Sequence, residues 1–207
     1  MRRLLIIGML LLAVGCGTKD PLEPVKPPVI LPLAEGNIWT YSYVTYDSLG
    51  FIARSVTLTR EVTQKVAIGG ETWSELTSIE EGSPPTVKYV VNRSDGLWQA
   101  DSETGVPYFG IKYPGKVNDL YTGINALGVK GITVTIGGIG ENVTTPAGEY
   151  PCYRYVWSFL FFGYLVEGTE YWAPDVGLMR MEATFTRTTD SKIYSNIVWQ
   201  LTEKDLK

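Results

Sequence analysis

From Ile38 onward the chain alternates apolar and polar residues with a period of two. In residues 132–136, Ile, Val and Ile alternate with two Thr, and residues 179–186 alternate Met, Met, Ala and Phe with polar side chains. This period is typical of antiparallel strands that bury one face. No stretch of ten residues shows the apolar stripe of an amphipathic helix. The pattern therefore predicts an all-β protein.

Turn signals interrupt the alternation about every ten residues. Clusters of Gly, Pro, Asp and Ser lie at residues 47–50, 69–70, 82–85, 94–96, 137–138 and 174–177. Such clusters favour tight turns between strands. A meander of this length normally curls to limit its exposed edges. We therefore predict a single antiparallel domain of about ten strands over residues 33–207, forming a curled sheet, half-barrel or barrel.

Two local features stand out from this pattern. One predicted strand has an apolar face, with Val56, Leu58, Val62 and Val66, that Arg60 and Gln64 interrupt. In addition, residues 32–40 and 114–122 share a pattern of Pro, three residues, Gly or Asn, Asn or Asp, an aliphatic residue, an aromatic residue and Thr. This echo, 82 positions apart, indicates either a duplicated half or a chance match.

The N-terminus has the three parts of a secretory signal, namely two arginines, an apolar run over residues 4–13 and a small residue, Gly15. The run is too short to span a bilayer as a helix. Because Cys16 follows Gly15, the segment resembles a bacterial lipobox. The resemblance implies cleavage between Gly15 and Cys16, a diacylglycerol on the Cys16 sulfur and acylation of the new amine, for example by palmitate. We predict a signal peptide over residues 1–15 and a lipid-anchored mature chain.

Residues 16–32 are predicted to connect this anchor to the domain. Five prolines lie between residues 17 and 32. Proline lacks a backbone donor and favours the extended polyproline II conformation. The segment is therefore expected to be an extended tether.

Composition excludes several kinds of chemistry. The chain has no histidine, which removes the commonest general base and zinc ligand. Its net charge of −4 argues against nucleic acid as a partner. The carboxylates, including Glu167 and Glu170, are scattered, and we expect them on solvated strand faces and turns. If Cys16 is acylated, Cys152 has no partner within the chain and is expected to be a buried, inert thiol. We predict no cofactor and no metal site.

An aromatic run is the densest candidate site. The odd positions of one predicted strand place five rings on one face, namely Tyr153, Tyr155, Trp157, Phe159 and Phe161. Such a face can line a groove for an apolar ligand, or it can form the core of a wide sheet. Both interpretations remain open at this stage.

Three short motifs carry a resemblance to a family. They are residues 33–41 (LAEGNIWTY), 145–150 (TPAGEY) and 171–178 (YWAPDVGL). In this order the chain resembles a group of uncharacterised bacterial secreted lipoproteins. The resemblance implies an all-β domain outside the cytoplasm, and it implies no known activity or catalytic residues.

These features predict a non-enzymatic binding or structural module of the bacterial cell envelope. Its partners would be the membrane, through the lipid on Cys16, and an apolar ligand or an envelope protein. No Asp follows Cys16 directly, which favours the outer membrane if the organism is Gram-negative. One alternative is a lipid carrier resembling the lipoprotein-localisation factors. A hydrolase with paired carboxylates is the third interpretation, and it needs two acids in one cleft.

Overall fold

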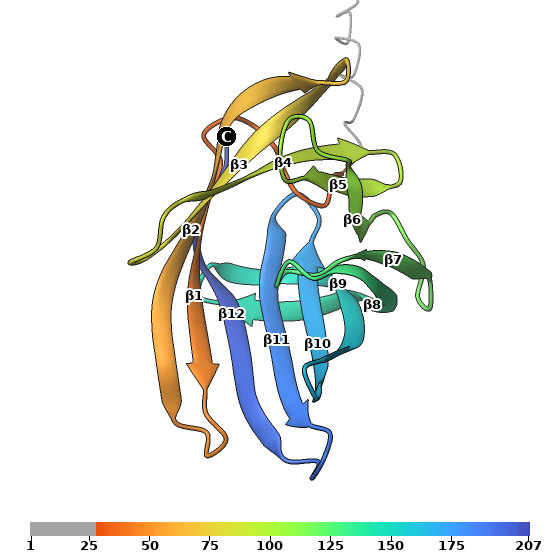
Figure 1. Ribbon diagram of the computed structural model, residues 1–207. Helices are drawn as coiled ribbons and strands as arrows, with labels where there is room; N and C mark the ends of the chain where they lie inside the picture. The colour runs from red at the N-terminus through yellow and green to blue at the C-terminus, as the bar shows by residue number, and fades with distance from the viewer. Residues whose placement is uncertain (1–27) are drawn as a thin grey trace, which may run out of the picture.

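The computed structural model describes residues 28–207, which form one twelve-stranded antiparallel sheet (Figure 1). The strands are β1 (Ile38–Tyr46), β2 (Ile52–Ile68), β3 (Glu71–Glu80), β4 (Thr86–Arg93), β5 (Gly96–Ala100), β6 (Tyr108–Lys112), β7 (Leu120–Ile124), β8 (Lys130–Thr145), β9 (Gly148–Phe161), β10 (Tyr164–Ala173), β11 (Gly177–Arg187) and β12 (Ile193–Asp205). The all-β prediction is confirmed, but about ten strands was too low a number. Strands β5, β6 and β7 have five residues each, so each shows too few alternations to be recognised from sequence.

The sheet curls into a nearly closed barrel. Strands that follow one another in the chain pair with each other, except β6 and β7, and β1 also pairs with β12, so that β6 and β7 form the two edges. These edges meet closely. A Cβ atom placed on Gly123 of β7 would lie 2.9 Å from the carbonyl oxygen of Gly110 in β6. The rings of Phe109 and Tyr121 also pack edge to face across this seam, with centroids 5.3 Å apart. One face of the sheet is therefore the interior of the barrel.

The first copy of the sequence echo forms the turn that leads into β1. Gly36 has a φ of 81°, a left-handed conformation that glycine adopts without strain. Its N–H donates to the carbonyl of Val62 over 2.8 Å, and the N–H of Val62 donates to the carbonyl of Asn37 over 2.9 Å. The register of β2 against β3 shifts directly after Val62. This turn therefore joins the start of β1 to the bulged middle of β2.

The second copy builds the same arrangement before β7. Asn118 is left-handed with a φ of 71°, and its N–H donates to the carbonyl of Ile136 over 2.8 Å. The N–H of Ile136 donates to the carbonyl of Asp119 over 3.0 Å, and the register of β8 against β9 shifts directly after Ile136. Strands β1–β6 and β7–β12 are thus two six-stranded halves with a common start. This repetition favours a duplicated half over a chance match.

One predicted turn is wrong. Gly137 and Gly138 lie inside β8, at the register shift against β9. Because glycine has no side chain, neighbouring side chains can approach closely at both positions. Arg154 donates to the carbonyl of Gly137 over 2.7 Å, and a Cβ atom on Gly138 would collide with Glu141. A glycine pair in a strand can mark a bulge as well as a turn, and here it marks a bulge.

The interior is packed with large side chains, among them Trp39 and Tyr155, which are 1% and 0% exposed. Cys152 is buried as predicted, and burial together with the nearby Glu141 raises the pKa of its thiol to about 12. Ile30 and Leu31, within the predicted tether, also belong to this core. The N–H of Val29 donates to Asp175 in the turn between β10 and β11. The packed part of the chain therefore begins a few residues before residue 33, because these two apolar side chains cap one end of the barrel.

Candidate functional site

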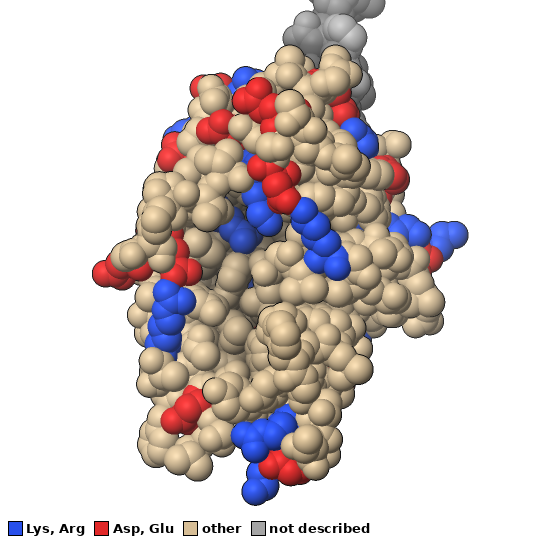
Figure 2. Space-filling model, in the orientation of Figure 1, with Lys and Arg blue, Asp and Glu red and all other residues tan. Residues whose placement is uncertain are grey.

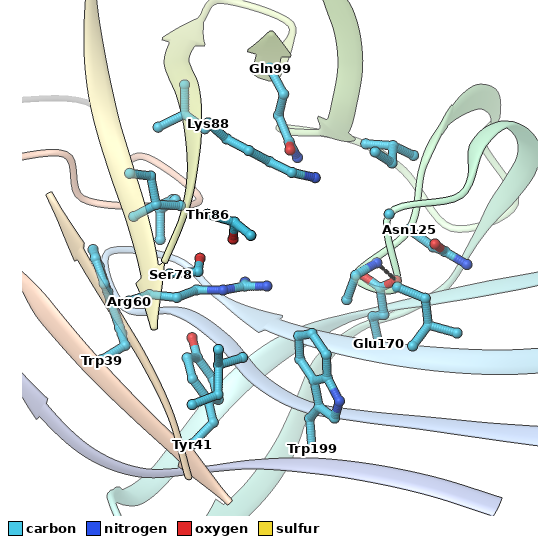
Figure 3. Close-up of a pocket in the computed structure, with 18 of the residues that line it drawn as sticks. Trp39, Tyr41, Arg60, Ser78, Thr86, Lys88, Gln99, Asn125, Glu170 and Trp199 are labelled. Carbon is cyan, nitrogen blue, oxygen red and sulfur yellow. Dashed lines mark hydrogen bonds between the residues drawn. The ribbon is translucent and has the colours of Figure 1, made fainter. Parts of the chain in front are cut away.

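The barrel interior is not completely filled, and a cavity of about 280 Å³ remains on one side. Figure 2 shows this face hollowed near its middle, with basic side chains inside the hollow. The apolar lining includes Leu31, Trp39, Leu58, Leu76, Val90, Leu97, Ile111, Ile124, Leu127 and Trp172. The polar lining includes Tyr41, Arg60, Ser78, Thr86, Lys88, Gln99, Asn125, Glu170 and Trp199 (Figure 3). The cavity therefore combines an apolar wall with a few polar groups, as ligand sites commonly do.

Arg60 projects into the cavity from β2. It lies between Trp39 of β1 and Ser78 of β3 in the register of the sheet. Its guanidinium carbon lies 5.7 Å from the ring centroid of Tyr41 and 5.1 Å from that of Trp199, distances typical of cation–π contacts. Burial lowers the pKa of Arg60, with Tyr41 and Glu170 opposing that shift. The group remains a cation, because arginine does not lose its proton in proteins.

Lys88 reaches the same space from β4 (Figure 3). Its Nζ lies 3.8 Å from the place that a Cβ atom on Gly128 would occupy, so the side chain extends toward the turn between β7 and β8. Burial lowers the pKa of Lys88, and the charge of Arg60 lowers it further. Two cations thus share one partly desolvated space.

Glu170 of β10 lies on the opposite wall and is 1% exposed. Its Oε1 accepts the N–H of Ala126 over 2.6 Å and the indole N–H of Trp157 over 2.9 Å, while its Oε2 accepts the indole N–H of Trp172 over 2.9 Å. The expectation of a solvated carboxylate is wrong for this residue. The alternation of residues along β10 could have indicated that Glu170 is buried, because Glu170 occupies the same face of the strand as Val166 and Trp172, which are both buried.

Burial raises the pKa of Glu170, and the three N–H donors and the charge of Arg60 oppose that shift. No ion pair joins Glu170 to Arg60 within the described chain, where every salt bridge of 4.0 Å or less involves other residues. The bond to Ala126 attaches the turn at residues 125–128 to the wall of the cavity. Glu170 therefore holds the cavity in shape.

Three buried N–H groups of the lining have no hydrogen-bond partner among residues 28–207. They are Nε of Arg60, Nδ2 of Asn125 and Nε1 of Trp199. A buried donor without a partner costs roughly 1–3 kcal/mol. All three are donors, and each belongs to a residue that lines the cavity.

The aromatic face predicted from sequence points into the barrel next to this cavity. Tyr155 and Trp157 are 0% and 2% exposed and belong to the hydrophobic core. Tyr153 and Phe159 pack partly buried against that core, while Phe161, at the tip of the β9–β10 hairpin, is 50% exposed. The five rings lie outside the cavity lining, although Trp157 contacts it through Glu170. Contact of these rings with a ligand stays a prediction.

Gly15 and Cys16 lie outside the described residues. Within residues 28–207, no group of three or more Cys, Asp or Glu side chains is placed to hold a metal ion. The same part of the chain contains no helix long and apolar enough to cross a membrane.

Comparison with known proteins supports the fold class. No protein-family model matches the sequence, and no curated protein matches it either. Among solved structures, the chain is similar to a candidate lipoprotein from Parabacteroides distasonis, with a TM-score of 0.53 and 15% identity over 86% of this chain and 99% of that one. A candidate exported protein of YmcC-like fold from Bacteroides fragilis gives a TM-score of 0.47 at 15% identity, over 86% and 99% of the two chains. At this identity, the first likeness identifies a shared all-β barrel-shaped fold.

Proposed function

We propose that this protein is a non-enzymatic binding module that holds a small, largely apolar ligand in the barrel cavity. The observation that carries this proposal is the cavity itself, which combines an apolar wall with polar residues, three of which have an unpartnered N–H group. A core that served stability alone would be filled to a high density and would contain few unsatisfied groups. The cavity volume of about 280 Å³ lies near the lower end of the range for small-molecule sites.

Features of the lining support binding rather than catalysis. The sequence has no histidine to activate the hydroxyls of Ser78 or Thr86. The buried carboxylate of Glu170 already accepts three hydrogen bonds. The second acid of the lining, Glu80, is ion-paired with Arg54. A hydrolase that uses paired acids would need two carboxylates free to act on substrate.

The proposed location is the bacterial cell envelope, where a lipid on Cys16 would anchor the domain. The support is the lipobox resemblance of residues 1–16. The alternative is a carrier that releases its ligand to a second protein and so resembles the lipoprotein-localisation factors.

Replacing the acylated thiol should release the protein from membranes. We expect the Cys16→Ser variant to move to the soluble fraction and to lose incorporation of radiolabelled palmitate, because a hydroxyl cannot take the thioether-linked diacylglycerol. The Cys152→Ser variant is the matched control and should stay in the membrane fraction, because Cys152 is buried inside the barrel. Membrane retention of Cys16→Ser equal to that of the wild type would refute anchoring through this thiol.

The cavity should bind a neutral apolar probe. We expect N-phenyl-1-naphthylamine to gain fluorescence at a single site on the full chain carrying Cys16→Ser, which needs no detergent. Adding Thr86→Trp should abolish this gain, because Thr86 is exposed and lines the cavity, so a large ring there fills the space without entering the core.

The neighbouring variant Val87→Trp is the control for this experiment. Val87 is on the same strand, is 40% exposed and lies outside the lining, so the probe should still bind. The absence of a saturable signal in the parent chain, or equal signals from both tryptophan variants, would contradict the proposal.

A further inference from the structure

We infer that the ligand carries an acid group, a carboxylate or a phosphate, at one end of a short apolar chain, and that Arg60 and Lys88 hold this group. The inference rests on the proposed function, since it assigns a chemical class to the ligand of the same cavity. It follows from the charges, the hydrogen-bonding groups and the size of the site.

Neither cation of the lining has an ion-pair partner, although the charges of Glu170 and Asp101 partly oppose the lowering of the pKa of Arg60 and of Lys88, respectively. Two cations, Arg60 and Lys88, face the cavity, and no carboxylate within the described chain lies within 4.0 Å of either. Glu80, the half-buried acid of the lining, is already paired with Arg54. A desolvated cation without a counter-charge is unfavourable. An anionic group on the ligand would provide that counter-charge.

The unpartnered polar atoms of the lining also favour a ligand with an anionic group. Arg60 Nε, Asn125 Nδ2 and Trp199 Nε1 are all donors. Asn125 uses its Oδ1 to accept the N–H of Val129 over 2.9 Å, so its amide group is fixed with the acceptor occupied. Ionised carboxylates and phosphates accept hydrogen bonds and donate none, and arginine binds both groups well. An alcohol or an amine would satisfy this set less completely.

The remaining lining defines the other end of the ligand. Apolar side chains of the lining come from each strand from β2 to β5, namely Leu58, Leu76, Val90 and Leu97. At about 280 Å³ the cavity lies near the lower end of the range for small-molecule sites. A small acid with a chain of about eight carbons therefore suits it better than a long acyl chain.

Competition between matched compounds tests this inference. On the full chain carrying Cys16→Ser, we would measure displacement of N-phenyl-1-naphthylamine by octanoate, octyl phosphate and octanol. We expect at least one of the two acids to compete roughly tenfold or more better than octanol, since hydrogen bonds to charged groups are the stronger ones. Stronger competition by octanoate would identify a carboxylate, and stronger competition by octyl phosphate would identify a phosphate. Acetate and inorganic phosphate alone should not displace the probe, because they lack the apolar chain.

Variants identify the groups that hold the acid. Arg60→Gln should reduce the preference of the better acid over octanol to about twofold or less, and Arg60→Lys should restore part of it. Lys88→Gln should weaken acid binding while leaving octanol unchanged. Arg187→Gln is the matched control, because Arg187 pairs with Asp190 in a distant hairpin, and it should keep the full preference.

The outcomes distinguish a failure of the acid-group inference from a failure of the proposed binding function. Equal competition by octanol and both acids would overturn the acid group while leaving an apolar binding site. This comparison uses the parent chain, so it decides the question even if an Arg60 variant fails to fold. A parent chain that does not bind the probe at all would overturn the proposed function itself.

Discussion

Replacing Trp39 with alanine should lower the free energy of unfolding by about 3–5 kcal/mol, the usual cost of truncating a buried tryptophan. The side chain is 1% exposed, and its indole N–H donates to the carbonyl of Val176 over 2.6 Å. Because Trp39 lines the existing cavity, the substitution enlarges that cavity, and it leaves the carbonyl of Val176 without its donor. Urea unfolding should show the loss, and the melting temperature should fall on the order of 10 °C.

Two further variants separate the contributions of ring and hydrogen bond. Trp39→Phe keeps most of the aromatic volume and removes the N–H donor, so it should cost less than Trp39→Ala. Trp98→Ala removes a partly exposed ring on the outer side of the barrel and should also cost less. Equal stability of wild type and Trp39→Ala would contradict the assignment of this ring to the core.

The Glu170→Ala variant should lose more than 3 kcal/mol of stability. Three buried N–H groups, from Ala126, Trp157 and Trp172, donate to this one carboxylate. Each buried donor left unpaired costs roughly 1–3 kcal/mol. Urea unfolding at constant pH would measure the loss. The exposed acid on the same strand provides the control, since Glu167→Ala should change stability by about 0.5 kcal/mol or less.

The same carboxylate should also produce a pH dependence. Because burial raises the pKa of Glu170 above its ordinary value of 4.5, the folded state binds this proton more tightly than the unfolded state does. The contribution to stability is therefore fully present below about pH 4.5 and is lost as the pH rises through the folded-state pKa.

Glu170→Gln isolates this pH effect, because an amide does not titrate. The difference in unfolding free energy between wild type and Glu170→Gln should change in favour of the variant as the pH rises from 4.5 toward 7. A difference between wild type and Glu170→Gln that stays constant over this range would contradict the raised pKa of Glu170.

Much of the fold was evident from short-range patterns. Alternation predicted the long strands correctly, because one side of each faces the barrel interior and the other faces solvent. The predicted number of strands was too low, and the short strands β5 to β7 are the hardest to recognise, since pairing and packing against neighbours define a five-residue strand more than its own pattern does. The glycine pair at 137–138 was misinterpreted for a related reason: a bulge and a turn both accept glycine.

The candidate site was less evident. The position of Arg60 was indicative, because Arg60 interrupts an apolar strand face, where a charged side chain is unusual. Glu170 gave a weaker signal of the same kind. Nothing in the sequence distinguishes Lys88 from a solvated lysine. Lys88 shares the cavity with Arg60 only because the fold brings together strand β2, strand β4 and the turn after β7.

Sequence was sufficient for the class of fold and for the antiparallel arrangement of the strands, because each depends on residues close together in the chain, whereas the lipid anchor at Cys16 stays a prediction. Only the tertiary structure decided how two six-stranded halves close into one barrel and which side of each strand faces its interior. The cavity inside the barrel also depends on this closure. A period of two assigns side chains to two faces of a sheet, and it carries no information on the curvature of that sheet. Curvature brings Arg60, Lys88, Asn125 and Glu170 around one space, and a cavity exists only where such distant residues leave room.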